Sequence, residues 1–253
     1  MNLAVLSAIV ITKNEAEHIA ECLDSLSFVD EIVVVDSHSV DGTEKIAKRF
    51  TDKVYIIMWN GYAKAKQYAL EKSTGEWILW LDADERIPPR LAEEIGEVIR
   101  ENNSFSGYRM PRKAFFLGRW IRHGGWYPGY VVRLFKKEKG RFGDERVHER
   151  LILDGSIGTL KSPLIHYTDQ SIEHYYDKLN RYTSLAALDL QERGKRVTAL
   201  GMLFRSIHMF VRMYVLRAGF LDGMEGFLLA VFSANYVFTK YAKLWKLGIK
   251  NSI

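Results

Sequence analysis

The sequence predicts an α/β fold, with a mainly parallel β-sheet between two layers of helices and a helical extension at the C-terminus. Short apolar, β-branched runs alternate with helical segments over the first hundred or so residues. From residue 172 onward the spacing of apolar residues is helical again. The 253 residues are 47% apolar and 26% charged, which are the values of an ordinary globular domain.

Local signals define each element of the alternation. Buried strands are expected at residues 7–12, 31–36, 53–58 and 77–81. Helices are expected at residues 15–26, 44–50, 62–72 and 90–100. Asn14 suits the N-cap of the first helix, Asp41 that of the second, and Pro88 and Pro89 begin the fourth.

The alternation of strands and helices ends near residue 106. Strands at 107–111, 131–135 and 147–153 lie among Gly- and Arg-rich turns, which indicates an antiparallel part. In residues 199–216 the apolar residues share one helical face and Arg205, His208 and Arg212 lie on another, as in a basic amphipathic helix. We therefore divide the chain into a domain at 1–195, with halves at about 1–105 and 106–195, and a basic helical tail at 196–253.

Several classes are excluded by simple features. The single cysteine, Cys22, rules out an intramolecular disulfide and a Cys-rich zinc site, which fits a reducing compartment. The first apolar run has no basic residue before it, so it is predicted to be a strand and not a signal peptide. The longest uncharged run, 226–239, would reach about 21 Å as a helix. The hydrocarbon core is about 30 Å thick, so we expect no membrane-spanning helix.

The positive charge is concentrated in two segments. The whole chain has a net charge of +5. Residues 108–150 contain twelve Lys or Arg against four acids, and residues 197–253 contain seven against two. Such segments attract phosphates, nucleotides and acidic lipids.

Polar clusters follow three of the predicted parallel strands, at 12–15, 36–37 and 82–84. Ligands of such sheets bind beyond the carboxyl ends of the strands, so these clusters form the candidate site. Asp82 and Asp84 offer hard oxygen ligands for Mg²⁺ or Mn²⁺, which would bridge to substrate phosphates. The alternative interpretation is a pair of solvated acids after a strand.

Two further groups extend this site. Asp36 leaves a buried strand where a carboxylate can accept from a base N–H or a ribose hydroxyl, and Gly42 permits the tight turn that follows. Lys64 and Lys66 are within reach of a bound diphosphate, although two solvated lysines on a helix explain the same pattern.

The order of motifs resembles family 2 glycosyltransferases of the GT-A fold. The motifs are IVITKNEAEHIAECLDSL, VVVDSHSVDGT, GYAKAKQYAL and GEWILWLDADE. The whole chain resembles the lipopolysaccharide core-biosynthesis branch of that family. The segments that point to it are GYVVRLFKKEKGRFGDERVHERL, IHYTDQSIEHYYDKLNRYTSLAA, RAGFLDGMEGFLLA and KYAKLWK.

The resemblance implies a nucleotide-diphosphate sugar donor, a divalent metal and inversion at the anomeric carbon. It further implies UDP as the carrier, a hexose such as glucose, and a glycan or lipid-linked acceptor such as inner-core heptose. The positions that match the family's donor site are Thr12, Asn14, Glu15, Asp36 for the nucleobase, Lys66 for the phosphates, and Asp82 and Asp84 for ribose and metal. It also makes His166 a candidate for an additional metal ligand.

The acceptor hydroxyl must lose a proton, which a positioned carboxylate can take. Many relatives have Glu-Asp before the acceptor-side helix, and this sequence departs from that pattern. Its acidic candidates there are Asp144, Glu145 and Glu149. Asp82 and Asp84 cannot serve if both lie on the metal side, so we favour Glu149.

The tail combines cationic helices with aromatic residues, which suits the interface of an anionic membrane. A helical pair packed on the catalytic domain or on a second subunit explains the same composition. We expect a cytoplasmic protein at the inner membrane surface, with no nucleic-acid partner. The alternative functions are a sugar-phosphate nucleotidyltransferase, whose Gly-rich loop is replaced here by Lys13-Asn14-Glu15, and a non-enzymatic module that binds anionic surfaces.

Overall fold

The computed structural model describes residues 5–101, 104–143, 151–169 and 171–250. The chain forms two compact units. The first unit consists of residues 1–112 and 130–166, and the second consists of residues 113–129 and 167–253. The strands β7 and β13 begin in the first unit and continue into the second.

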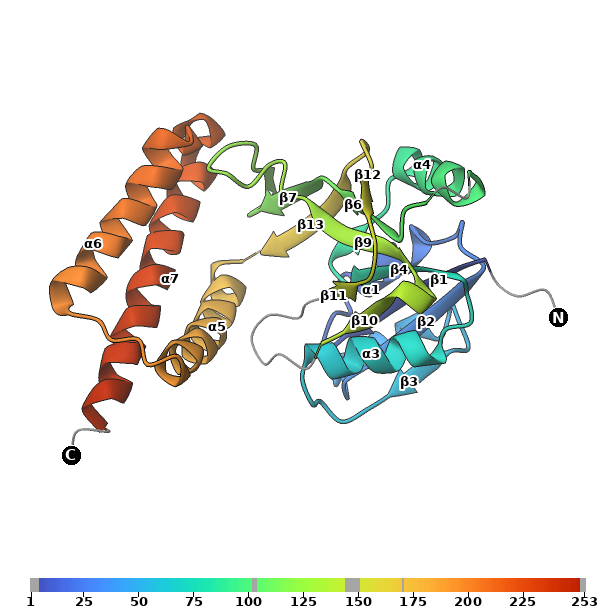
Figure 1. Ribbon diagram of the computed structural model, residues 1–253, viewed down its shortest axis with the longest axis horizontal. Helices are drawn as coiled ribbons and strands as arrows, with labels where there is room; N and C mark the ends of the chain where they lie inside the picture. The colour runs from blue at the N-terminus through green and yellow to red at the C-terminus, as the bar shows by residue number, and fades with distance from the viewer. Residues whose placement is uncertain (1–4, 102–103, 144–150, 170, 251–253) are drawn as a thin grey trace. The chain divides into compact units, whose positions relative to one another are not determined.

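The first unit is built on a mixed, mainly parallel sheet (Figure 1). Among the described residues this sheet has seven strands, in the order β12-β6-β9-β4-β1-β2-β3. Their bounds are β1 Leu6–Thr12, β2 Glu31–Asp36, β3 Val54–Ile56, β4 Trp77–Asp82, β6 Gly107–Met110, β9 Val131–Lys136 and β12 Ile157–Thr159. Strand β1 is parallel to β2 and β4, and β2 is parallel to β3. Strand β9 lies antiparallel to both β4 and β6.

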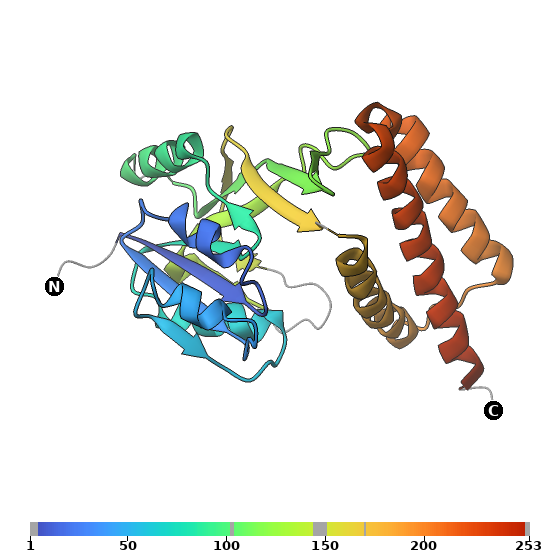
Figure 2. The ribbon, with the colours of Figure 1, turned by 180° about the vertical axis from the view of Figure 1, so that it is seen from behind.

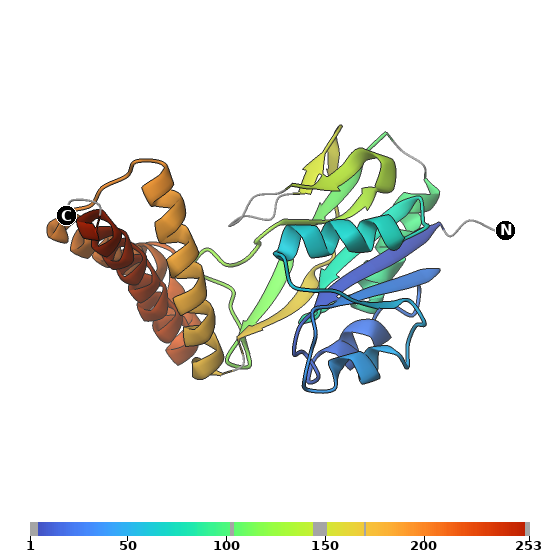
Figure 3. The ribbon, with the colours of Figure 1, turned by 90° about the horizontal axis from the view of Figure 1, so that it is seen from below.

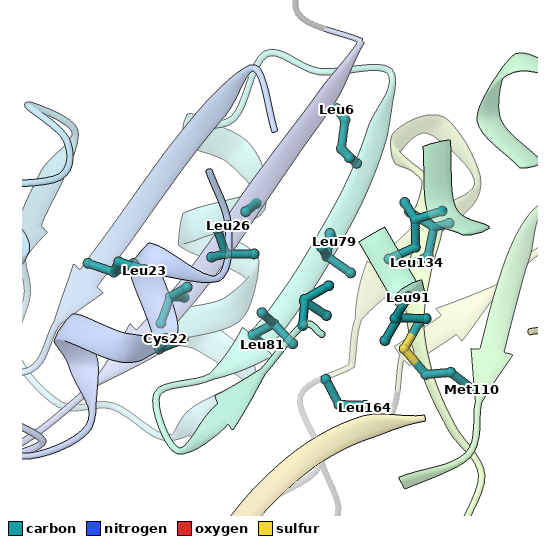
Figure 4. Close-up of a cluster of buried hydrophobic side chains, with 14 of the residues drawn as sticks. Leu6, Cys22, Leu23, Leu26, Leu79, Leu81, Leu91, Met110, Leu134 and Leu164 are labelled. Carbon is teal, nitrogen blue, oxygen red and sulfur yellow. The ribbon is translucent and has the colours of Figure 1, made fainter. Parts of the chain in front are cut away.

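Helices cover both faces of this sheet. They are α1 Ile19–Asp24, α2 Thr43–Ala47, α3 Tyr62–Lys72 and α4 Pro89–Arg100. Apolar residues of α1, α2 and α4 pack on one face (Figure 2), and those of α3 pack on the other (Figure 3). Strand residues alternate between the two clusters because successive side chains point to opposite faces. Figure 4 shows the larger cluster, where Leu23 of α1, Leu79 of β4 and Leu91 of α4 are almost completely buried.

Two short strand pairs complete the first unit. Strand β5, Glu85–Arg86, pairs antiparallel with the first part of β13, Leu164–Asp169. Strand β10, Gly140–Phe142, follows the short 3₁₀ helix η1, Lys137–Lys139, and pairs with β11, Leu151–Leu153.

The second unit is mostly helical. A hairpin joins β7, Arg112–Phe116, to β8, Arg119–Trp120. The helical segments are α5 Ile172–Glu192, α6 Ala199–Phe210, η2 Val211–Leu216, η3 Gly219–Asp222 and α7 Gly223–Lys250. Phe116 of the hairpin and Phe232 of α7 belong to this unit's own apolar core. Side chains of Ser171 and Thr198 cap the N-termini of α5 and α6.

The structure confirms the predicted mainly parallel sheet and reproduces the expected strand Glu31–Asp36 and helix Tyr62–Lys72. Two predicted caps are wrong. Helix α1 begins only at Ile19, so Asn14 is not its N-cap, and Asn14 has a left-handed φ of 55°. Gly42, with a φ of 93°, occupies the N-cap of α2 in place of Asp41.

One helical stretch of the described chain, Ala199–Leu216, has the length and mean hydropathy (1.3) of a membrane-spanning helix. Only 17% of it is buried within the structure. This match rests on length and composition alone, so it is weak evidence for a span. Our expectation that no helix of this chain crosses a membrane stays a prediction.

Candidate active site

Three polar strand ends lie side by side at one edge of the first unit's sheet. The register places Thr12 beside Asp36 and Ile11 beside Asp82. Parallel pairing of β4, β1 and β2 produces this arrangement, because their carboxyl ends all reach the same edge. Ligands of open α/β sheets bind at such an edge.

The loops that follow β1 and β2 are bonded to each other. The Asn14 backbone N–H donates to Ser39 Oγ at 2.7 Å, and the Val40 N–H donates to Asn14 Oδ1 at 2.9 Å. Asp36 accepts from the N–H of Ser39 at 2.8 Å and from its hydroxyl. Asp36 is almost fully buried, so its first role in this structure is to shape the loop.

A second set of bonds secures the start of α2. Asp41 accepts from the backbone N–H groups of Ala16 and Thr43, both at 3.0 Å. Burial raises the pKa of Asp41, but these bonds and the Thr43 hydroxyl outweigh it and keep the pKa below its ordinary value. The Glu15 N–H donates to Thr43 Oγ1 at 2.8 Å. The buried Thr12 hydroxyl has no hydrogen-bond partner within the described part of the chain.

Asp82 lies between two cations. Its Oδ1 is 3.1 Å from Lys66 Nζ, and its Oδ2 is 2.9 Å from Arg133 Nη2. The same Arg133 nitrogen is 2.6 Å from Glu85 Oε1. The Asp82 N–H donates to Glu85 Oε2 at 3.1 Å, which closes the turn between β4 and β5.

The ring of Trp80 lies against both of these cations. Lys66 Nζ is 4.1 Å from the centre of the Trp80 ring, and the Arg133 guanidinium is 3.5 Å from it. The indole N–H donates to the Val132 carbonyl at 2.9 Å, which sets the plane of the ring. Cations over an aromatic face are attracted to its negative quadrupole.

Burial and charge act in opposite directions at this cluster. Desolvation raises the pKa of Asp82, but the charges of Lys66 and Arg133 outweigh it and hold the pKa well below its ordinary value. Glu85 is fully buried, and this burial raises its pKa against the opposing charge of Arg133. The Asp82 side chain is 37% exposed, whereas those of Lys66 and Arg133 are 3% and 4% exposed. Asp82 is therefore the accessible member of a buried charged cluster.

A carboxylate–imidazole pair lies next to this cluster. His166 of β13 pairs in register with Glu85 of β5, and its Nε2 is 3.2 Å from Asp84 Oδ2. Both side chains are 14% exposed, and His166 Nδ1 is buried with no hydrogen-bond partner among the residues described. Nowhere in the described ranges are three or more His, Cys, Asp or Glu arranged as metal ligands. Asp84 and His166 are thus two neighbouring candidate ligands within the described part of the chain.

The structure brings most of the predicted site residues to this edge. They are Thr12, Asn14, Glu15, Asp36, Lys66, Asp82, Asp84 and His166. The base candidates Asp144, Glu145 and Glu149 lie outside the described residues. Sequence analysis gave no role to Arg133 or Trp80. The signal for Arg133 was a single charge inside the apolar strand Val131–Lys136.

Known proteins resemble this chain in sequence and in fold. The sequence profile of glycosyl transferase family 2 matches residues 7–157. The lipopolysaccharide core biosynthesis glycosyltransferase LpsC of Rhizobium meliloti (strain 1021) is 32% identical over 253 residues, which cover 95% of this chain and 92% of that protein. An uncharacterized glycosyltransferase of Rickettsia felis (strain URRWXCal2) is 31% identical over 254 residues, covering 96% and 89% of the two chains.

Solved structures share the fold. The mannosyltransferase PcManGT from Pyrobaculum calidifontis, in complex with GDP-Man and Mn²⁺, has a TM-score of 0.52 at 18% identity and is matched over 99% of this chain and 88% of that one. S. aureus TarS 1–349 in complex with UDP has a TM-score of 0.50 at 17% identity, over 98% and 92%. The match to the family profile extends over more than half of the sequence, and the chain belongs to glycosyl transferase family 2.

Proposed function

We propose that this glycosyltransferase is an inverting hexosyltransferase that moves glucose from UDP-glucose to a lipid-linked acceptor, the inner-core heptose of lipopolysaccharide. One observation is its main support: a carboxylate, Asp82, is placed between two buried cations at the ligand-binding edge of the sheet. The likeness to LpsC, a lipopolysaccharide core glycosyltransferase, supports the acceptor class. TarS with bound UDP has the same fold, which is compatible with UDP as the carrier.

The proposed reaction breaks the bond between the anomeric carbon and the diphosphate oxygen. The electron pair of that bond leaves with the nucleoside diphosphate, and positive groups near the leaving phosphate stabilise its charge. Lys66 and Arg133 are cations at this edge. The acceptor oxygen attacks the opposite face of the sugar, and its proton passes to a carboxylate. We assign that base to Glu149, with Asp144 and Glu145 as alternatives.

The remaining donor contacts follow the loops at the sheet edge. We assign the nucleobase to Asp36 and the loop of Thr12, Asn14 and Glu15. Asp36 already accepts two bonds from Ser39, but an ionised carboxylate has about four lone-pair positions, so it can also accept from a base. The Thr12 hydroxyl is buried and has no hydrogen-bond partner among the described residues, so it suits a polar contact with the donor.

The residues beside the cluster fit a divalent metal. Asp84 Oδ2 and His166 Nε2 are 3.2 Å apart, so both atoms are close enough to hold the same ion. Carboxylate oxygen and imidazole nitrogen suit Mn²⁺, and oxygen ligands suit Mg²⁺. Asp84 and His166 would hold the ion, with Asp82 facing the donor. When bound, the ion would neutralise charge on the departing diphosphate.

The test is an assay of nucleotide release from a panel of nucleotide sugars, with purified full-length protein and a heptose-terminated core acceptor. We expect UDP-glucose to give turnover that needs both the acceptor and Mn²⁺ or Mg²⁺. Asp84→Asn with His166→Gln should abolish this metal-dependent turnover while circular dichroism shows an intact fold, and Asp154→Asn is the exposed control. Full turnover in EDTA would contradict the metal assignment, and turnover with another sugar would contradict glucose.

We also propose that the protein acts at the cytoplasmic face of the inner membrane, as a peripheral protein. The basic, aromatic tail supports this, because a lipid-linked acceptor is presented at that surface. Washing membranes with alkaline carbonate should release the protein. Retention after that wash would instead mean that Ala199–Leu216 crosses the bilayer.

A further inference from the structure

An open pocket of about 540 Å³ lies in the second unit, between α6 and α7. Phe204, Arg205 and His208 of α6 line it together with Lys240 and Tyr241 of α7. All of these residues belong to the second unit, whereas the donor-site residues belong to the first. The proposed transfer reaction does not use this pocket.

The described lining of the pocket is cationic. The Arg205 guanidinium is 5.0 Å from the centre of the Tyr241 ring, and Lys240 Nζ is 4.9 Å from it. No acidic residue is among the described residues that line the pocket. Burial lowers the pKa of Lys240, and the charge of Arg205 lowers it further. The negative charge of a bound anion would act in the opposite direction and raise this pKa, so the lining suits an anionic ligand.

Exposed apolar side chains are present on both helices, and one of them, Phe204, also lines the pocket. Leu200, Leu203, Phe204 and Ile207 of α6 are all more than half exposed. On α7, Phe238 and Trp245 are 44% and 51% exposed. Successive residues of a helix turn by about 100°, so each set forms a stripe along one side of its helix. Figure 1 shows the two helices side by side.

We propose that the pocket binds the phosphate of an anionic phospholipid, with the two apolar stripes in contact with the acyl chains. The combination supports a lipid over a soluble anion, because the cations and the exposed apolar side chains belong to the same two helices and Phe204 lines the pocket beside Arg205. This inference rests on the proposed membrane contact and is independent of the sugar transferred.

The test compares two charge-matched double variants of the full-length chain. Arg205→Gln with Lys240→Gln removes two cations from the pocket. The control, Arg212→Gln with Lys246→Gln, also removes two exposed cations. Arg212 lies in η2 and Lys246 in α7, and neither residue lines the pocket. Binding is measured to vesicles of phosphatidylglycerol and phosphatidylcholine, and to pure phosphatidylcholine vesicles. Thermal melting of each variant checks its fold, and Leu200→Ser is a third variant that changes the apolar stripe outside the pocket lining.

We expect the pocket variant to lose about tenfold or more affinity for phosphatidylglycerol vesicles relative to its matched control. A short-chain phosphatidylglycerol should raise the melting temperature of the unchanged protein at concentrations where inorganic phosphate does not. Equal losses in the two double variants would overturn the discrete site, because they would indicate a diffuse attraction. An equal rise of the melting temperature with inorganic phosphate would overturn the lipid assignment. Self-association through α6 and α7 without vesicle binding would overturn it as well. Glucosyl transfer to a soluble acceptor should persist in the pocket variant, which separates this proposal from the donor site.

Discussion

Arg133 links the two acids of the donor edge. It is nearly buried, it contacts Asp82 and Glu85 through one nitrogen, and its guanidinium lies over Trp80. A buried charge is stable only when it is paired and hydrogen-bonded. Removing the guanidinium would leave the fully buried Glu85 without its cation.

Arg133→Met should therefore lower the free energy of unfolding by about 3 kcal/mol and also weaken donor binding. Chemical denaturation measures the first effect, and calorimetric titration with UDP measures the second. Arg141→Met, at an exposed position of β10, is the control and should change little. Adding Glu85→Leu should restore part of the lost stability, because no buried charge then stays unpaired. A further loss in that double variant would contradict the pairing argument.

Glu31, at the opposite end of the sheet, should make the stability of the folded chain depend on pH. It accepts from Ser7, from Lys53 and from the Thr74 N–H at 2.7 Å. Burial raises its pKa, but these bonds outweigh it and keep the pKa below the ordinary value of 4.5. Because folding lowers this pKa, the ionised carboxylate adds stability that is complete above about pH 4.5. That stability is lost as the pH falls through the lower pKa of the folded chain.

Glu31→Gln should thus lower the free energy of unfolding by about 1 kcal/mol near neutral pH. The difference from the unchanged protein should shrink as the pH falls below 4.5, the ordinary pKa of the group. Urea denaturation at a series of pH values measures it. Glu76→Gln, at an exposed position, should show no such trend. A difference that grows on acidification would have the wrong sign and would contradict the assignment.

Helix α4 supports the strand that contains His166. Glu94 of α4 accepts from the backbone N–H groups of Lys161 and Ser162 at 2.7 and 2.8 Å, just before β13 begins. Burial raises the pKa of Glu94, but these two bonds outweigh it and lower the pKa overall. The helix thereby positions the turn from which β13 leads to His166.

We expect Glu94→Ala to lower the free energy of unfolding by about 2 kcal/mol, because two backbone donors lose their acceptor. It should also raise the Mn²⁺ concentration needed for half-maximal turnover, since His166 follows this turn. Glu97→Ala, at an exposed position of the same helix, serves as the control. An unchanged metal requirement alongside the loss of stability would show that α4 does not influence the position of His166.

At the scale of the whole molecule, the two units have separate apolar cores. The clusters around β1 and β4 belong to the first unit, and the cluster around Phe116 and Phe232 belongs to the second. The described donor-site residues all lie in the first unit. Donor binding should therefore stabilise the first unit directly.

Hydrogen exchange tests this division. UDP with Mn²⁺ should slow amide exchange in the loops after β1, β2 and β4, because bound ligand suppresses local opening there. Amides of α6 and α7 should exchange at unchanged rates. Equal slowing in both units would show that the donor site and the helical unit open together.

Local patterns in the sequence predicted much of the fold. The runs at 32–35 and 77–81, within β2 and β4, are continuous and apolar, as expected for strands buried on both faces. Parallel pairing then places Thr12, Asp36 and Asp82 at one edge without further information. Asn14 failed as a cap because its side chain and backbone bond the neighbouring loop, at Ser39 and Val40. A contact with a separate strand loop leaves no signal in local propensity.

The sequence by itself determined the alternation of strands and helices over the first hundred residues, the acids and lysines at the sheet edge, and the basic character of the tail, because periodicity and turn residues are local properties. Only the tertiary structure decided that Arg133 joins Asp82, and that His166 meets Asp84 across 82 positions of sequence. Those contacts depend on β9 pairing antiparallel with β4 and on β13 pairing with β5. Long-range packing selects such pairings and their register, and the alternation of residues along one strand does not encode them.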